Sequence, residues 1–516
     1  MNLKSIALFA LMAVTYECFS QSFNIKDFGA IADGRTINTT AIQQTIDKCF
    51  SEGGGTVYVP SGIFITGTIH LKSNVNLYLE SGAVLKGSSS IADYEPFERP
   101  GFGKTNYGML FTLKAENVSI TGQGTIDGNE EAFFDWNKAK TIAWGGTTYT
   151  RQKENFRKVM SGIGDGPVDP AKMRPHQMVI FSQCKNVLVE DVLISKSPFW
   201  TLHFADCDGV IVKGVKIWNS LETPNSDGLD ITSCNNVNVS DCDIRAGDDA
   251  IAITGYAYHY ELPGYYVLRH KSENINISNC NLQSRSSGIR IGFEDQNTVK
   301  NINISNVNIF DSNRGIGIFV RDSGSIENVH ISRVNIETRL HTGDWWGNGE
   351  PIHISAIRSK KDGIIGQVKN VTFRDVICRS ENGILLYGTE ESHLENIRFE
   401  NVRFNLVNSA LNEYAGGNID LRGCLDLQQS LFQHDIPGIY AQFVRNLTIN
   451  DFTLEWEKPQ FPFFTHGIEV NNFTTLRINN FAGNGAPGNA SALPVYVSKG
   501  SDFKIDGESE TVKNLK

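Results

Sequence analysis

A short strand-like segment recurs along most of this chain, and the repeat restricts the folds that are open to it. Each copy opens with Asn or Gly and continues with alternating apolar, often β-branched residues. Nine copies begin at Asn186, Gly209, Asn236, Asn274, Asn301, Asn328, Asn370, Asn396 and Asn446. Most spacings are 23 to 27 residues, and the longer ones indicate inserted loops or a missed rung. Such alternation predicts strands with one buried face, and a period in the twenties predicts a solenoid.

The repeat fits a right-handed parallel β-helix better than a leucine-rich repeat, because the fixed leucine spacing is absent. The recurrent Asn suits a turn, where it tolerates left-handed backbone and its side chain can bond to the rung above. We therefore predict an all-β chain that folds as a single-stranded right-handed parallel β-helix. Residues 21–516 should form one domain, since a solenoid grows by stacking rungs on one core.

The open N-terminal end of such a coil needs a cap, and the sequence offers a short amphipathic helix for it. Asn38 or Thr39 can cap the start of this helix. One face of the helix would present Ala41, Ile42, Thr45, Ile46 and Cys49. We expect that face to close the first rung.

Charge and composition exclude some partners. The 516 residues carry a formal net charge of −10, and no dense run of Lys or Arg suggests nucleic acid. An acidic enzyme acting on an acidic polymer would need local Arg or Lys in its groove, because its overall field repels the polymer. We expect a monomer.

The first 20 residues have the features of a secretory signal peptide. A positive start is followed by an apolar run from Ile6 to Val14 and by Ser20 at the expected cleavage point. The run is too short for a transmembrane anchor. Lipid attachment at Cys18 is a less favoured alternative, because its neighbours fit that signal poorly. We predict a secreted or periplasmic protein without a membrane span.

Cysteine placement follows the repeat. Removal of Cys18 would leave eight of the nine cysteines, an even number that permits disulfides in an exported protein. Cys184, Cys207 and Cys234, however, each stand just before a repeat start. We favour a stack of small buried thiols over disulfides.

Two long insertions interrupt the repeat, one near 129–173 and one near 341–350. Long loops on a regular scaffold are commonly where ligands bind. The second insertion contains Trp345 and Trp346 among glycines, which suggests an aromatic platform for a sugar face. The alternative is that these rings only plug the side of the coil.

The acidic motifs carry the strongest chemical signal. Asp227 lies in Asn225-Ser-Asp-Gly, and Asp248 and Asp249 follow 21 and 22 residues later, about one coil of the solenoid. This spacing places the three carboxylates on neighbouring rungs, and paired carboxylates are what glycoside hydrolysis requires. Asp-Gly also forms turns, but adjacent Asp248 and Asp249 ahead of a buried strand favour catalysis. We interpret Asp230 as structural.

With these motifs, most of the mature chain resembles glycoside hydrolase family 28, the polygalacturonase family. Residues 225–228 match the family's Asn-Thr-Asp-Gly motif, and residues 247–249 match its Gly-Asp-Asp motif. The segments 27–34 and 53–60 resemble its N-terminal region. The resemblance implies a pectin-lyase-like β-helix that cleaves pectic polysaccharide.

At two further family motifs, this chain differs from the family. Ser287 stands where a Gly-His-Gly histidine is expected, and Arg314-Gly-Ile-Gly replaces an Arg-Ile-Lys triplet. In polygalacturonases those bases contact the galacturonate carboxylate at the cleaved bond, so galacturonate at that subsite is in doubt. Arg290 and Arg321 are the new basic candidates on nearby rungs. A neutral sugar or a uronate held differently fits this pattern. The rhamnogalacturonan-acting members of the family also lack the histidine, so a specificity like theirs is a further alternative.

The resemblance also implies roles for individual residues. It implies hydrolysis with inversion at the anomeric carbon, with Asp248 as general acid and with Asp227 and Asp249 activating water. It implies no metal or cofactor. The residues that we expect to contact substrate are Asn225, Ser287, Arg290, Arg321, His203 and Trp345. A structural role is an equal alternative for His203.

Two other functions remain open at this point. An acidic cluster can bind Ca²⁺, and β-helix polysaccharide lyases use calcium with a basic residue as proton abstractor. Arg290 could serve there, which makes a lyase or an epimerase the enzymatic alternative. A non-catalytic glycan-binding solenoid is the third hypothesis.

Overall fold

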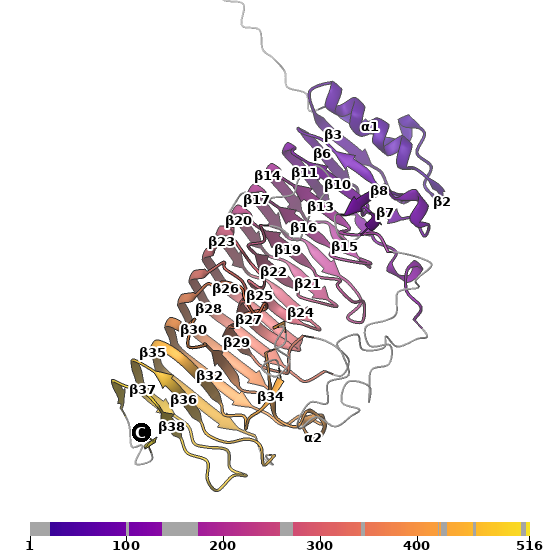
Figure 1. Ribbon diagram of the computed structural model, residues 1–516. Helices are drawn as coiled ribbons and strands as arrows, with labels where there is room; N and C mark the ends of the chain where they lie inside the picture. The colour runs from indigo at the N-terminus through magenta and orange to yellow at the C-terminus, as the bar shows by residue number, and fades with distance from the viewer. Residues whose placement is uncertain are drawn as a thin grey trace, which may run out of the picture.

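The computed structural model confirms the predicted fold, a right-handed parallel β-helix drawn as a long stack of rungs in Figure 1. It describes residues 21–99, 103–136, 174–257, 272–341, 346–421, 423–424, 431–457, 461–506 and 512–515. Among these residues, 36 strands belong to one continuous sheet, and the main-sheet pairings are parallel. The predicted signal peptide, with Cys18, lies outside the described residues.

Each rung contributes strands to successive faces of the coil. The first face bears the site described below. Its strands are β5 (Ile69–Leu71), β10 (Leu110–Leu113), β13 (Val179–Ser182), β16 (Leu202–Ala205), β19 (Leu229–Thr232), β22 (Ile251–Thr254), β25 (Ser287–Ile291), β27 (Arg314–Val320), β29 (Ile352–Ala356), β31 (Ile384–Tyr387), β35 (Ile439–Trp456), β36 (Ile468–Phe473), β38 (Val495–Ser498) and β40 (Val512–Leu515).

The other faces contain the repeat and the strand that follows it. The repeat strands are β1 (Ser22–Asn24), β3 (Gly55–Val59), β6 (Val75–Leu79), β11 (Glu116–Gly122), β14 (Lys185–Glu190), β17 (Asp208–Lys213), β20 (Asn235–Ser240), β23 (Ser272–Ser278), β26 (Val299–Ser312), β28 (Ile326–Thr338), β30 (Val368–Ser380), β32 (Leu394–Leu406), β37 (Leu476–Ala482) and β39 (Phe503–Ile505). The third face is built from β2 (Asp33–Ile37), β4 (Gly62–Thr66), β7 (Ala83–Gly87), β12 (Thr125–Asp127), β15 (Leu193–Ser195), β18 (Lys216–Trp218), β21 (Asp243–Ala246) and β24 (Asn281–Ser284). Strands β26, β28, β30 and β32 each run through both of these faces, and β35 continues from the first face through both of them.

Apolar residues stack inside the coil in strict register. Val187 pairs with Val210, and Val210 pairs with Val237 on the next rung. All three are at most 1% exposed. Burial of a Val or Ile side chain contributes about 1.5–3 kcal/mol, so each added rung extends one continuous core.

The repeat Asn residues form a hydrogen-bonded ladder outside this core. Asn301, Asn328, Asn370 and Asn396 all have left-handed backbone, with φ of 54° to 57°. The side-chain Nδ2 of each donates to the side-chain Oδ1 of the Asn one rung earlier, at 2.8 to 3.2 Å. Both features predicted for the recurrent Asn are confirmed.

The N-terminal cap and the thiol stack are also present. Helix α1 (Thr39–Ser51) buries Ile42, Thr45, Ile46 and Cys49 against the first rungs, although the Asn38 side chain bonds to neighbouring backbone rather than capping it. The eight described cysteines are all buried, and they are thiols rather than disulfides. The Cys184 backbone N–H donates to the Cys207 sulfur at 3.4 Å, one rung above it.

A few shorter elements decorate the coil. Two antiparallel hairpins are β8 (Pro96–Arg99) with β9 (Gly103–Asn106), and β33 (Asn418–Asp420) with β34 (Leu431–Gln433). The short helices are η1 (Ile25–Phe28), η2 (Ile91–Asp93), η3 (Glu130–Ala132) and α2 (Asn412–Ala415). None of the described helices is long and apolar enough to cross a membrane.

One outward-facing column of the first face positions the site. Alternate residues of these strands enter the core, so the residues between them form a floor on the outer side. In consecutive rungs, the column reads His203, Asp230, Ala252, Arg290, Gly317 and His353.

Replacement of Asn328 tests the contribution of the ladder. Asn328→Ala loses hydrogen bonds to two neighbouring rungs and places a Cβ without polar compensation at φ 57°. We expect a loss of about 2 kcal/mol in the free energy of unfolding, measured by urea denaturation. Asn328→Gly keeps the backbone unstrained and should lose less. Equal stability of both variants and the wild type would contradict a stabilising ladder.

Candidate active site

The register of the first face brings the three predicted carboxylates together. Asp227 ends the turn before β19, and Asp248 and Asp249 end the turn before β22. The Gly228 N–H donates to the Asp249 carbonyl oxygen at 2.9 Å, which locks the two turns side by side. One oxygen from each carboxylate lies within 4.8 Å of the others. Their exposed fractions are only 3%, 9% and 3%.

Asp249 is fixed by two donors from the next rung. Its Oδ1 accepts the Ser287 backbone N–H at 2.9 Å, and its Oδ2 pairs with the Arg290 guanidinium. Ser287 is fully buried and is not among the residues that line the pocket, so it orients Asp249 through its backbone, while its hydroxyl oxygen accepts from Arg314 Nη1 at 3.4 Å. Donors of this kind hold a carboxylate in one orientation.

Asp227 lies in a very different environment. Burial, followed by the charges of Asp248, Asp230 and Asp249, raises the pKa of Asp227 well above its usual range, against the opposing effect of Arg290. Burial likewise raises the pKa of Asp230, directly below on the floor. The cluster therefore retains a proton at a pH where isolated aspartates have lost theirs. This proton belongs to the coupled set rather than to a single group.

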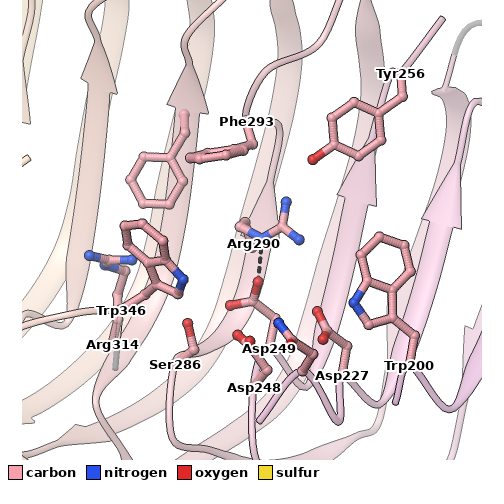
Figure 2. Close-up of a pocket in the computed structure, with 12 residues that line it drawn as sticks. Trp200, Asp227, Asp248, Asp249, Tyr256, Ser286, Arg290, Phe293, Arg314 and Trp346 are labelled. Atoms are coloured by element: carbon pink, nitrogen blue, oxygen red, sulfur yellow. Dashed lines mark hydrogen bonds and ion pairs between the residues drawn. The ribbon is translucent and has the colours of Figure 1, made fainter. Parts of the chain in front are cut away.

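The carboxylates open into a cavity of about 200 Å³. Figure 2 shows the acids on one side, Arg290 above them, and the rings of Trp200 and Trp346 on opposite flanks. The lining residues are Trp200, Asn225, Asp227, Asp248, Asp249, Tyr256, Ser286, Arg290, Phe293, Arg314, Phe319 and Trp346.

Both ends of the cavity are walled along the coil. On the N-terminal side, Tyr256 packs in a cluster with Phe97 of the β8–β9 hairpin and Tyr107. On the C-terminal side, Trp346 meets Phe293 edge to face. Gly423, in the segment between β33 and β34, lies so close to Phe293 that a Cβ there would come within 2.5 Å of the ring. The site is a pocket rather than an open groove.

Two guanidinium groups reach this pocket, and one of them escaped the sequence analysis. Arg314 lies beside Ser287 on the adjacent rung, donates to Glu350 at 2.8 Å, and contacts the Phe319 ring. Although burial opposes it, the charge of Arg314 together with His353 lowers the pKa of Glu350 to about 2. Aligning the rungs residue by residue would have drawn attention to Arg314.

Gly317, three residues after Arg314, occupies a floor position with no room for a basic side chain. A Cβ on Gly317 would come within 2.5 Å of the Phe319 ring. The ring of Phe319 therefore covers the floor position next to Arg290, and a longer side chain at Gly317 would have to displace it.

Arg321 requires a correction. We expected it in the groove, but it is 2% exposed and does not line the pocket. Its guanidinium packs behind Phe319 and donates to the Ser355 carbonyl and hydroxyl oxygens. Burial lowers its pKa to about 10. Strand β27 ends between Arg314 and Arg321, which turns the second guanidinium away from the pocket.

The remaining expected contacts are divided. Asn225 lines the pocket. His203 is fully buried behind Trp200 with its Nε2 3.0 Å from the Thr232 hydroxyl, and burial lowers its pKa to about 3. The position of His203 thus agrees with a structural role rather than with a contact to substrate. Trp345 lies outside the described residues, while its neighbour Trp346 lines the pocket.

Comparison with known proteins identifies relatives. The profile described as glycosyl hydrolases family 28 matches residues 49–413. The chain is 28% identical over 276 residues to a probable polygalacturonase of Vitis vinifera, covering 50% of each protein. It is 29% identical over 256 residues to an exo-poly-alpha-D-galacturonosidase of Dickeya chrysanthemi, covering 44% of this chain and 41% of that protein. The chain thus spans about half the length of the curated relatives it matches.

Solved structures with the same fold extend this result. A family 28 exopolygalacturonase of Yersinia enterocolitica superposes with a TM-score of 0.63 at 18% identity, covering 95% of this chain and 79% of that one. A hyperthermoactive exopolygalacturonase of Thermotoga maritima gives 0.54 at 23% identity, covering 75% and 87%. At these identities the likeness shows the shared β-helix.

The raised pKa of Asp227 predicts that replacing this residue with Asn stabilises the protein, and that the gain depends on pH. A raised pKa favours folding fully below the unfolded value and ever less as pH rises toward the folded value. An Asn at position 227 does not titrate, so the Asp227→Asn variant avoids this loss of stability. Its free energy of unfolding at pH 7 should exceed that of the wild type by about 1–2 kcal/mol. The gap should narrow toward pH 4. Thermal unfolding across this pH range would test it.

Asp33 supplies the control for that experiment. Its carboxylate is exposed, and hydrogen bonds from Thr36 and Arg35 lower its pKa. Asp33→Asn should therefore give no gain at pH 7. A matching gain at both positions would show that the effect is not specific to the buried cluster.

Proposed function

Because the chain belongs to glycosyl hydrolases family 28, we propose that it is a secreted hydrolase that cleaves glycosidic bonds in pectic polysaccharide with inversion of configuration. The observation that carries the proposal is the set of three carboxylates, with one oxygen of each within 4.8 Å of the others, in a walled pocket that also contains two guanidinium groups.

The environments of the acids support separate roles. Asp249, oriented by Ser287 and Arg290, is the fixed proton acceptor for an attacking water, and Asp227 helps to hold that water beside it. Asp248 is the most exposed of the three and protonates the leaving oxygen. Closely spaced carboxylates push their pKa values apart, which allows one to be an acid while another is a base. The negative cluster also stabilises an oxocarbenium-like transition state.

The two guanidinium groups favour a uronate in the pocket. Arg290 and Arg314 replace the basic residues that the family motifs would place on these rungs. Guanidinium groups bind carboxylates with two parallel hydrogen bonds. The aromatic rings around them supply faces for sugar C–H groups. The net charge of −10 makes such local positive charge necessary for an acidic substrate.

The walls at both ends of the pocket favour attack at chain ends. A polymer that crossed the site would have to displace Tyr256 and its cluster, or Trp346 and the segment near Gly423. Short products should therefore appear from the start of the reaction. Secretion rests on the signal-like residues 1–20, and analysis of the N-terminus of exported protein would test it.

A lyase or epimerase is the competing activity, because the three carboxylates are close enough to ligate one cation. In the described structure, Asp249 already accepts from Arg290 and from the Ser287 N–H. This pairing favours the hydrolase. A glycan-binding protein without activity is the remaining candidate, and it would release no product.

Product analysis with Asp248→Asn tests the function. Wild type should release saturated short sugars from polygalacturonan or rhamnogalacturonan with and without chelator, with inverted anomeric configuration by NMR. Asp248→Asn should lower kcat by about 10³-fold or more, because the leaving oxygen loses its proton donor. Calcium-dependent unsaturated products, or near-normal activity in Asp248→Asn, would contradict the assignment.

Arg314→Gln tests uronate recognition. We expect kcat/KM on de-esterified pectic oligosaccharides to fall about 10- to 100-fold, mainly through KM, while the methyl-esterified counterparts change little. Arg398→Gln, on an exposed strand of another face, is the matched control. Equal losses on charged and esterified substrates would show that Arg314 serves folding rather than specificity.

A further inference from the structure

The turn that carries Asp227 is held from outside the repeat. Residues 219–228 connect β18 to β19, and this segment contains Thr223, Pro224 and Asn225. Asn225 has left-handed backbone with φ 55°, so the turn does not follow regular strand geometry. Two charged residues from beyond these rungs bind it, Glu130 and Arg174.

Glu130 holds the turn from the third face of the coil. It is 4% exposed, and its Oε2 accepts the Thr223 hydroxyl at 2.5 Å. The Thr223 carbonyl oxygen then accepts the Ser226 hydroxyl at 2.8 Å, and the Ser226 oxygen accepts the Gly247 N–H at 3.0 Å. This chain of hydrogen bonds joins the turn of Asp227 to the turn of Asp248.

Arg174 holds the same turn from the other side. Its Nη1 donates to the carbonyl oxygens of Pro224 at 2.6 Å and Pro198 at 3.0 Å, and its Nη2 donates to the Asn225 side chain at 2.7 Å. The guanidinium also lies 4.7 Å from the centre of the Phe199 ring. A guanidinium with planar, fixed donors defines the position of its partners more rigidly than an ammonium does.

We propose that Glu130 and Arg174, which border the long insertion, are positioning residues that clamp the turn carrying Asp227 and set its place relative to Asp248 and Asp249. The effect of the clamp on rate rests on the proposed hydrolysis. The contacts by which the clamp holds the turn do not depend on that function. A displacement of about 1 Å at a reacting group lowers rates on the order of 10²-fold.

A carboxylic acid at Glu130 is not what stability alone would select. Burial raises the pKa of Glu130 to about 7, with Glu131 adding to the effect and Thr223 and Lys196 opposing it. A neutral amide would accept the same hydrogen bond without a buried titratable group. Replacement of Glu130 by Gln therefore separates the contact with Thr223 from the charge.

Kinetics of clamp variants give the first test. Glu130→Ala and Arg174→Ala should lower kcat about 10- to 100-fold with KM within threefold of wild type, because substrate still binds to the guanidinium groups. Glu130→Gln should recover much of that loss, whereas Arg174→Lys should recover less, because an ammonium lacks the planar donors that bind Pro198, Pro224 and Asn225. Glu131→Ala is the matched control, since Glu131 lies on the same short helix but is 64% exposed in its ion pair with Lys196. A loss in Glu130→Ala no larger than in Glu131→Ala would overturn the clamp.

A second test does not require activity. The stability gain of Asp227→Asn at pH 7 depends on Asp227 being held against Asp230, Asp248, Asp249 and Arg290. In a Glu130→Ala background the turn can relax, so the thermal shift caused by Asp227→Asn should shrink by about half. An unchanged shift would overturn the clamp. If wild type cleaves no pectic substrate while the shift does shrink, the clamp stands and only the proposed function fails.

Discussion

Register between parallel rungs is the constraint on which the rest of this molecule depends. Each strand pairs with the equivalent strand of the next coil, so a residue meets its counterpart rather than a random neighbour. Val stacks on Val inside, and Asn bonds to Asn outside. A shift of one residue would turn the apolar residues outward and break the ladder at once. The core and the ladder therefore enforce the same alignment.

The active site uses this alignment and then departs from it. Register brings the turns of Asp227, Asp248 and Asp249 side by side. The pocket, however, is shaped by particular side chains, among them Phe319 over Gly317 on a regular strand and Trp346 from an insertion. The carboxylates are buried enough to shift the pKa of Asp227, yet Asp248 keeps some exposure. Regular structure supplies the distances, and particular side chains supply the shape and the environment.

The placement of the basic residues shows where sequence reasoning fails. Arg290 reaches the pocket as expected, because it lies on the floor column one rung beyond Ala252. Arg321 lies on a nearby rung, which makes it a candidate from the sequence, but it packs behind Phe319. Arg314 begins a motif that departs from the family pattern, and it lines the pocket. The difference depends on where β27 ends and on one aromatic rotamer, and no repeat pattern encodes either.

The sequence by itself determined the β-helix, the capping helix, the buried thiols and the grouping of three aspartates, because each of these follows from a period or from local backbone preferences. Only the tertiary structure decided that the site is a walled pocket, that His203 is buried, and that Glu130 and Arg174 grip the turn of Asp227. The grip on the turn, for example, depends on contacts between residues 50 and 93 positions apart that belong to no repeat. Local chemistry can predict how a rung is built, but contacts among insertions are fixed only when the whole coil is assembled.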